Sequence, residues 1–247
     1  MSTIDKTYSF PVIIGISILL SAFVIAGAYT YKFKDKSRVM VTGKAEKDFV
    51  SDLIVWRGDY SRVSMDLKVS YATLKNDELA IRSYLKNKGL KENEIVFSAV
   101  NINKLYNPQY DTNGRLLSNT FGGYSLTQNV KVESKNINQV EKISREITEL
   151  IQSGIELNSA APSYYYTKMS ELKIDLLSKA SKDAKDRSQS IAENAGSSLG
   201  DLKYANMGVF QITGKNSDED FSYGGAFNTS SKNKTASITI RTEYAVK

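Results

Sequence analysis

Chemistry in this chain has to come from Asp, Glu, Lys, Tyr, Ser and Thr, because its 247 residues include no histidine and no cysteine. Their absence excludes a Ser-His-Asp triad, a cysteine nucleophile and metal sites built on His or Cys. The acidic run Asp218-Glu219-Asp220 lacks the alternating ligands and final Glu of a calcium loop. The pair Gly224-Gly225 lacks the frame of a phosphate-binding loop. We therefore expect no catalytic residue, no cofactor and no metal in this protein. An enzyme that used a carboxylate pair or a Lys–Tyr pair is the least favoured class, since no spacing predicts one.

The apolar segment Pro11–Tyr31 contains 21 residues and no charge. A helix needs roughly 20 apolar residues to cross a hydrocarbon core of about 30 Å. We expect this segment to span a bilayer, with Pro11 at the start of the helix and the tyrosines at the membrane interface. The residues expected to contact lipid are Pro11, Ile14, Ile18, Leu20, Phe23, Ile25, Tyr29 and Tyr31.

Two questions about this segment stay open at the level of sequence. Ala26-Gly27-Ala28 has the small-x-small form at which signal peptidases cut, so cleavage after Ala28 is an alternative to an uncleaved anchor. Lys32, Lys34, Lys36 and Arg38 follow the segment while only Lys6 precedes it. The positive-inside rule, applied alone, would place the domain that follows in the cytoplasm.

Beyond the anchor the charges of both signs alternate, so the net charge of +6 describes a solvated surface. A nucleic-acid groove would show clustered Lys and Arg with interleaved aromatics, and we expect no nucleic-acid partner.

Hydrophobic periodicity predicts alternating strands and helices after residue 38. Strands are expected at 39–43, 51–63, 95–105, 124–132, 155–166, 202–213 and 238–246. The first helix follows Ser64 as N-cap and stops at Gly89, the second starts at Asn136 or at the capping box Asn138-x-x-Glu141, and the third ends at Gly196. Their expected buried faces are Leu67, Tyr71, Leu74, Ile81 and Leu85; Val140, Ile143, Ile147, Leu150 and Ile151; and Met169, Leu172, Leu176, Ala180, Ala184, Ile191 and Ala195.

Several single features complete the expected pattern. The small Ala180 and Ala184 allow a close approach to a sheet, and Trp56 is expected in a core or an interface. The last strand should bury Ile238, Ile240, Thr242, Tyr244 and Val246 on one face. Residues 107–119, which contain Asn113-Gly114, are expected as an exposed hairpin loop.

The order of these elements repeats. Strand, helix, Gly-Leu turn and two hairpin strands occur from Leu53 to Glu133 and again from Ile155 to Val246. The expected fold is α+β, with two βαββ-like halves in a mostly antiparallel sheet and the helices packed on one face.

The soluble part resembles the SIMPL domain (DUF541) family. The resemblance rests on the opening Val39 to Trp56, on Gly89-Leu90 with Glu94-Ile95, on Ala195-Gly196 with Leu199-Gly200, and on Thr239-x-Arg-x-Glu-Tyr244. Together these segments cover about Arg38 to Val246.

The resemblance implies an envelope protein of the membrane-anchored bacterial subgroup. It implies a single-pass protein of the inner (cytoplasmic) membrane whose domain faces the periplasm or the cell exterior. Some relatives build ring or cage homo-oligomers, and relatives are associated with oxidative-stress defence; no catalytic residue can be carried over. The expected organisation is a tail at 1–10, a transmembrane anchor at 11–31, a basic linker at 32–37 and a SIMPL-like α+β domain at 38–247.

Three functions of different classes follow. The first is a non-enzymatic structural module, tethered to the bilayer through residues 11–31, which self-associates. The second is a module that binds an unknown small ligand or a partner protein through loops 107–119 and 215–234, and the third is the enzyme. The residues expected to contact a partner or a second copy are Tyr106, Tyr110, Tyr164, Tyr165, Tyr166, Phe221 and Tyr223.

Overall fold

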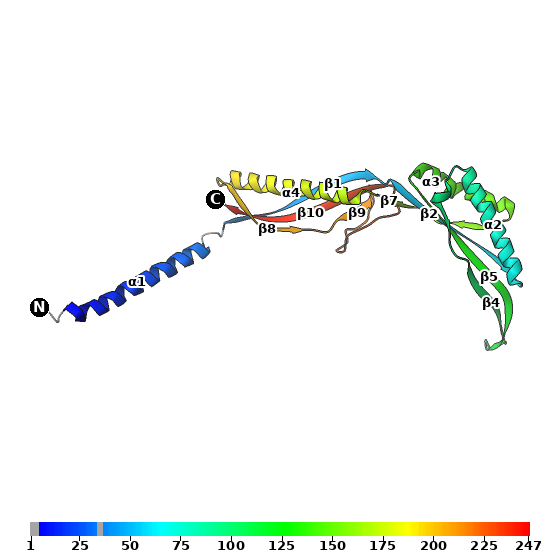
Figure 1. Ribbon diagram of the computed structural model, residues 1–247, viewed down its shortest axis with the longest axis horizontal. Helices are drawn as coiled ribbons and strands as arrows, with labels where there is room; N and C mark the ends of the chain where they lie inside the picture. Colours follow the sequence, from blue (N-terminus) through cyan, green and yellow to red (C-terminus); the bar gives the residue numbers. More distant parts are fainter. Residues whose placement is uncertain (1–4, 34–36) are drawn as a thin grey trace. The chain divides into compact units, whose positions relative to one another are not determined.

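The computed structural model of the chain describes residues 5–33 and 37–247 (Figure 1). Parts of the predicted tail (1–10) and of the predicted linker (32–37), including Lys34 and Lys36, lie outside these residues. The chain divides into two compact units. Unit 1 comprises Met1–Ala45, Ile174–Val209 and Ser237–Lys247, and unit 2 comprises Glu46–Lys173 and Phe210–Ala236. Each is described by itself below.

Helix α1 spans Asp5–Phe33, and the side chains of residues 11–32 are exposed. The expectation that Pro11 starts the helix is wrong, because the helix begins at Asp5 and Pro11 lies inside it. A proline inside a helix has no N–H for the hydrogen bond to the preceding turn, and its ring crowds the carbonyl group four residues earlier. The segment Pro11–Lys32 is long and apolar enough to cross a membrane, a property that anchors and signal sequences share.

Unit 1 is built on a sheet with the strand order β1-β10-β8, beside helix α4 (Figure 1). Strand β1 spans Arg38–Val50, β8 spans Leu199–Met207, β10 spans Asn233–Val246 and α4 spans Met169–Asn194. In unit 1, α4 buries a stripe at a spacing of four: Leu176, Ala180, Ala184, Ser188 and Ala192. The prediction for Ile191 and Ala195 is wrong, since both are exposed. The spacing of four continues from Ala184 through Ser188 to Ala192, so Ala192 takes the buried position instead of Ile191.

Helix α4 and strand β1 touch backbone to backbone at Gly43. A Cβ at this position would lie 2.3 Å from the carbonyl oxygen of Ala180 and 2.5 Å from the amide nitrogen of Ala184. The predicted close approach of Ala180 and Ala184 to a sheet is therefore confirmed. The carboxylate of Asp183 adds a bond to the same strand by accepting the N–H of Lys44 at 2.9 Å.

The last strand, β10, changes phase near its end. Ile238, Ile240 and Thr242 are buried as predicted, but the register shifts between Glu243 and Tyr244 and again between Tyr244 and Val246. These irregularities turn Ala245 inward instead of Tyr244 and Val246. A bulge reverses the alternation of faces that the sequence pattern predicts.

Unit 2 contains a six-stranded sheet of order β3-β5-β2-β6, with β4 paired to β5 and β7 paired to β2. The strands are β2 (Leu53–Ser64), β3 (Ile95–Phe97), β4 (Asn101–Tyr110), β5 (Leu116–Ser134), β6 (Leu157–Ser159) and β7 (Ser163–Tyr165). A further strand, β9 (Gln211–Gly214), pairs with β10. The predicted strand 95–105 is thus divided between β3 and β4, and the predicted strand 202–213 between β8 and β9.

The helical elements of unit 2 are α2 (Leu67–Asn87), α3 (Ile137–Glu146) and the 3-10 turns η1 (Glu92–Glu94) and η2 (Ile147–Ser153). Helices α2 and α3 contact both β2 and β5. They enclose a core that contains Trp56, as predicted, together with Leu74, Ile81, Val130 and Ile143.

One predicted cap, Ser64, and two predicted core residues are wrong. The N-cap of α2 is Asp66, whose carboxylate accepts the N–H of Lys68 and of Val69. The N-cap of α3 is Asn136, which is one of the two predicted positions. Tyr71 and Ile151 are exposed. Ser70 takes the buried position beside Tyr71, because its hydroxyl donates to the carbonyl of Arg62.

The fold is α+β with antiparallel sheets, as predicted. The second βαββ copy, however, does not draw its first strand from residues 155–166. Strands β6 and β7 pair with β2, whereas the pair β8–β10 is joined by β1. Hydrogen-bond pairing between strands decides which strands form one sheet, and hydrophobic periodicity does not encode this pairing.

Candidate interaction surfaces

Residues 101–121 form a two-stranded arm that comprises β4, a tip at 111–115 and the start of β5. Strand β2 ends at Ser64, opposite Tyr124, so beyond this point β5 is paired with β4 alone. Every residue of β4 and the first six residues of β5 are exposed. The ribbon extends past the end of α2 (Figure 1).

The core face of the sheet continues along this arm as an aromatic strip. Leu126 is fully buried and Tyr124 packs against the core. The Phe121 ring lies 5.1 Å from that of Tyr124, and the Tyr106 ring lies 5.9 Å from that of Phe121. The face that α2 and α3 cover in the body of the unit is therefore uncovered on the arm.

The tip of the arm is a tight turn next to exposed leucines. The carboxylate of Asp111 accepts the N–H groups of Asn113 and Arg115, both at 2.8 Å. Gly114 has a positive φ of 77°, as the Asn-Gly pair predicts. The predicted loop 107–119 is too long, because strand pairing continues down to Tyr110 opposite Leu116.

The free edge of β4 is poorly suited to pairing with another strand. Pro108, near the end of β4, has no N–H to donate, and the register shifts at Leu105/Tyr106 and at Gln109/Tyr110. Prolines and bulges are the usual protection of edge strands. Contacts to the arm are therefore expected through side chains on its faces rather than through its backbone.

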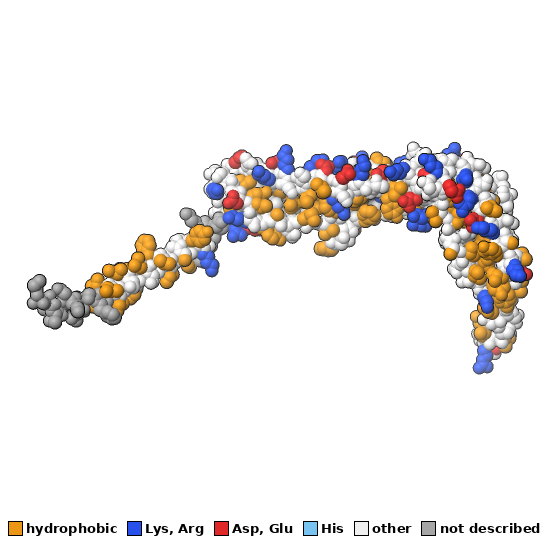
Figure 2. Space-filling model, viewed as in Figure 1, with side chains coloured by type: hydrophobic (Ala, Val, Ile, Leu, Met, Phe, Trp, Pro, Cys, Tyr) orange, Lys and Arg blue, Asp and Glu red, His pale blue; other side chains and the backbone are white. Residues whose placement is uncertain are grey.

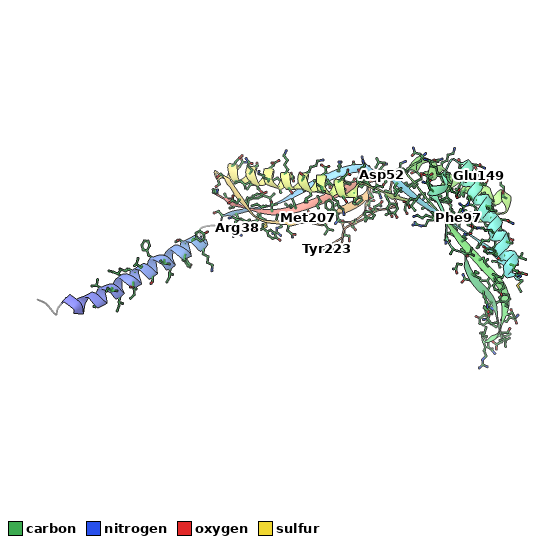
Figure 3. The ribbon with its side chains drawn as sticks, in the orientation of Figure 1. Arg38, Asp52, Phe97, Glu149, Met207 and Tyr223 are labelled. Atoms are coloured by element: carbon green, nitrogen blue, oxygen red, sulfur yellow. The ribbon has the colours of Figure 1, made fainter. Side chains whose placement is uncertain are left out.

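A second exposed surface is the segment 215–232 between β9 and β10, called the aromatic loop below. The side-chain amide of Gln211 donates to the carbonyl of Ser222 at 2.8 Å and accepts the N–H of Ala226 at 2.7 Å. Glu219 accepts the N–H of Gly214 and the side-chain amide of Asn228. These bonds hold a loop that exposes Phe221, Tyr223 and Phe227. Figure 3 labels Tyr223, which is fully exposed.

Lys234 fixes the base of this loop. Its side chain is buried, and its ammonium group donates to the carbonyl oxygens of Tyr164 and Asn228. Burial lowers the pKa of Lys234, and Glu219 partly opposes the shift. The amide of Tyr164 also donates to the carbonyl of Thr229 at 2.7 Å.

The three consecutive tyrosines make contacts within unit 2. The hydroxyl of Tyr164 donates to Glu141 at 2.9 Å, and burial together with this carboxylate raises the pKa of Tyr164 to about 12. Tyr165 pairs with Leu53, and the Tyr166 ring lies 4.9 Å from that of Phe49. All three are half-buried. The exposed candidates are therefore Tyr106, Tyr110, Phe221 and Tyr223.

Two adjacent acids of α2, Asp77 and Glu78, are buried, a feature that the sequence did not reveal. The guanidinium group of Arg62 binds both carboxylate oxygens of Asp77. Glu78 accepts hydrogen bonds from Lys75, Gln128 and Arg82. Burial raises the pKa of Glu78, but these bonds outweigh it and hold the pKa below its ordinary value. Each acid is thus neutralised by a cation, an arrangement that fastens α2 to β2 and β5.

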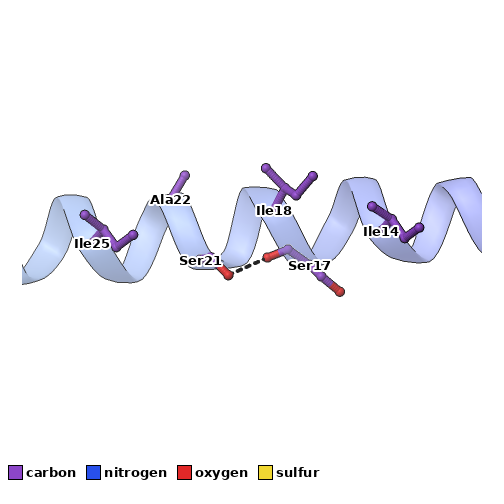
Figure 4. Close-up of a pocket in the computed structure, with 6 residues that line it drawn as sticks. All are labelled: Ile14, Ser17, Ile18, Ser21, Ala22 and Ile25. Carbon is purple, nitrogen blue, oxygen red and sulfur yellow. Dashed lines mark hydrogen bonds between the residues drawn. The ribbon is translucent and has the colours of Figure 1, made fainter.

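The predicted lipid contacts lie along helix α1. Ile14, Ile18, Leu20, Phe23, Ile25, Tyr29 and Tyr31 are all exposed. The hydroxyl of Ser17 donates to the carbonyl of Ile13, and that of Ser21 to the carbonyl of Ser17 (Figure 4). Hydroxyl groups bonded in this way to their own helix are compatible with a hydrocarbon environment.

The sequence pattern identified only part of the two surfaces. Leu116, Leu117, Phe121 and Phe227 are exposed members that it did not single out. The signal available was the uncharged run from Leu116 to Val130, in a chain of which 24% is charged.

An apolar N-terminal helix followed by antiparallel sheets with packed helices defines an α+β class of protein. The family model for SIMPL, described as a protein of unknown function (DUF541), matches residues 39–244. The chain belongs to this family. A comparison with curated proteins finds no match.

Proposed function

We propose that this protein is a membrane-anchored SIMPL-family module of the cell envelope that acts without catalysis, by self-association. The observation that carries the proposal is the aromatic strip of the arm, which continues a buried core face into solvent. Figure 2 shows hydrophobic side chains along the arm and a basic side chain at its tip. Apolar and aromatic surface with few charges is typical of the central part of protein interfaces.

Helix α1 supports the other half of the proposal. Anchoring through Pro11–Tyr31 confines the copies to one plane and raises their effective concentration, so that weak contacts between arms and neighbours become populated. In this proposal the domain lies outside the cytoplasm, in the periplasm or at the cell exterior, as the family resemblance implies. The association of relatives with oxidative-stress defence extends the proposal to envelope stress.

Light scattering on the full-length protein in detergent tests self-association. We expect a species larger than the monomer. The variant Tyr106→Ser/Phe121→Ser should weaken the association between copies, because both rings lie on the aromatic strip. The variant Tyr71→Ser is a matched control, since Tyr71 is an exposed tyrosine on α2. A wild-type protein that stays monomeric at high concentration contradicts the proposal.

A second candidate function is the binding of a small ligand or a partner protein. The hydrogen bonds within the aromatic loop favour it, because a loop that already presents Phe221, Tyr223 and Phe227 in one arrangement loses less entropy on binding. Monomeric wild-type protein that captures a defined partner through residues 215–232 would favour this candidate over self-association.

A further inference from the structure

The arm and the aromatic loop, which both belong to unit 2, carry opposite charges. Lys104 and Arg115 on the arm are exposed, and their side chains form no ion pair within the described residues. The single acid of the arm, Asp111, is engaged with the backbone of the turn. The charged groups that the arm offers to a partner are therefore basic.

The aromatic loop offers the reverse. Asp218 and Asp220 are exposed and form no ion pair in the part of the chain that the structure describes. Glu219, between them, is occupied by Gly214 and Asn228. Of the basic groups of the loop, Lys215 is paired with Asp48 at 2.7 Å and Lys232 with Glu141 at 3.4 Å. The free charges of the loop are therefore acidic.

Exposed apolar side chains accompany the charges on both surfaces. Next to Arg115 lie Leu116 and Leu117, which are 54% and 66% exposed. Next to Asp220 lies Phe221, which is 63% exposed, and Tyr223 follows. An apolar centre bordered by charges of opposite sign is the composition that complementary protein surfaces share.

We propose that the tip of the arm of one copy docks onto the aromatic loop of a second copy. The proposal rests on the self-association argued above and names its surfaces. At the tip, Arg115 faces Asp218 and Asp220, while the leucines pack against Phe221 and Tyr223. Lys104, which pairs with Tyr124 at the base of the arm, adds to the positive charge of the arm. Contact between two arms would bring basic groups together, and contact between two loops would bring acids together, each at a cost.

The contact is heterologous, because each copy gives an arm to one neighbour and a loop to another. Such contacts generate closed rings or open-ended chains rather than isolated dimers. A mixture of two one-sided variants must then stop at the dimer, and this distinguishes the arrangement from a symmetric one.

The experiment uses full-length protein in detergent and measures mass by light scattering. The arm variant is Lys104→Glu/Arg115→Glu, and the loop variant is Phe221→Asp/Tyr223→Asp. We expect each variant alone to associate roughly tenfold or more weakly than wild type. An equimolar mixture should give 1:1 dimers that do not grow, because one native arm meets one native loop. The variant Lys182→Glu/Lys185→Glu, with the same change of charge on the exposed face of α4, is the matched control and should associate as wild type does.

A reciprocal exchange of charge separates docking from misfolding. A chain that combines Lys104→Glu/Arg115→Glu with Asp218→Lys/Asp220→Lys should recover the assembly that the arm variant loses. If wild type assembles and the arm variant assembles equally well, the docking proposal is overturned while self-association stands. Loss of assembly without recovery in the exchanged chain also overturns it, since the arm then contacts something other than this loop. A monomeric wild type overturns both proposals.

Discussion

At the scale of residues, single polar groups fasten helices to sheets in both units. In unit 1 the carboxylate of Asp183 accepts the N–H of Lys44 and is paired with Arg187 at 2.9 Å. The hydrogen bond from the Lys44 backbone, with help from Arg187, lowers the pKa of Asp183 below its ordinary value of 3.8. A depressed carboxyl pKa stabilises the folded state above the ordinary value, and the stabilisation is lost as the pH falls through the folded pKa.

Asp183→Asn should therefore destabilise the protein at neutral pH but much less in acid. We expect a loss of about 1 kcal/mol at pH 7, typical of a hydrogen bond to a partly exposed charged group. Urea unfolding of the full chain, followed by circular dichroism, should show the difference from wild type shrinking below about pH 4. Asp186→Asn, on the exposed face of α4, is the control for the change of charge. A difference that stays constant between pH 7 and pH 3 would contradict this account.

At the scale of elements, the contact between α4 and β1 depends on the absence of a side chain at Gly43. The atoms that a Cβ would meet belong to the backbone of Ala180 and Ala184, together with the Ala184 methyl group. Backbone atoms cannot rotate out of the way as the end of a long side chain can. The helix and the strand would have to separate to make room.

Gly43→Ala should accordingly destabilise unit 1 by about 3 kcal/mol, as overpacking of a rigid site does. Thr42→Ala, next to it on the exposed face of β1, should leave the stability within about 0.5 kcal/mol of wild type. Both values can be measured by urea unfolding. Equal stability of the two variants would show that α4 does not lie against Gly43 in solution.

Element positions and the α+β class were predictable from periodicity, because burial of one face imposes the spacing. Ala180 and Ala184 even predicted the close approach, since small residues in a buried stripe have few other uses. Local hydrogen bonds were not predictable in the same way. Asp66 rather than Ser64 caps α2, and the bulges in β10 exchange Tyr244 for Ala245.

The candidate surfaces were predicted in part for the same reason. Tyrosine is common in cores and at interfaces, so composition alone did not separate Tyr110, which is exposed, from Tyr164, which bonds to Glu141. Strand pairing distinguishes the exposed tyrosine from the half-buried one. The pairing of β2 with β5 ends at Tyr124, so the arm beyond it has no covering layer. Register of this kind depends on distant residues, which a local pattern does not contain.

At the scale of the whole molecule, the proposal requires that the domain lie outside the cytoplasm. Intact spheroplasts treated with protease should lose the region Lys32–Lys247, because only the short N-terminal side would be sheltered. A cytoplasmic protein of known location in the same cells serves as the control for leakage. Protection of Lys32–Lys247 would reverse the proposed orientation and agree with the lysines that follow the apolar segment.

The pairing of β1 with β10 has a consequence for biosynthesis. Strand β1 leaves the ribosome soon after the apolar helix α1, whereas its neighbour β10 begins only at Asn233. Most of unit 2 lies between them and can form from consecutive residues, but the first strand of unit 1 waits for the last. Pairings between distant segments are slow to form, and strands that wait unpaired are prone to aggregate. We therefore expect β1 to stay unpaired in emerging chains until β10 has been synthesised.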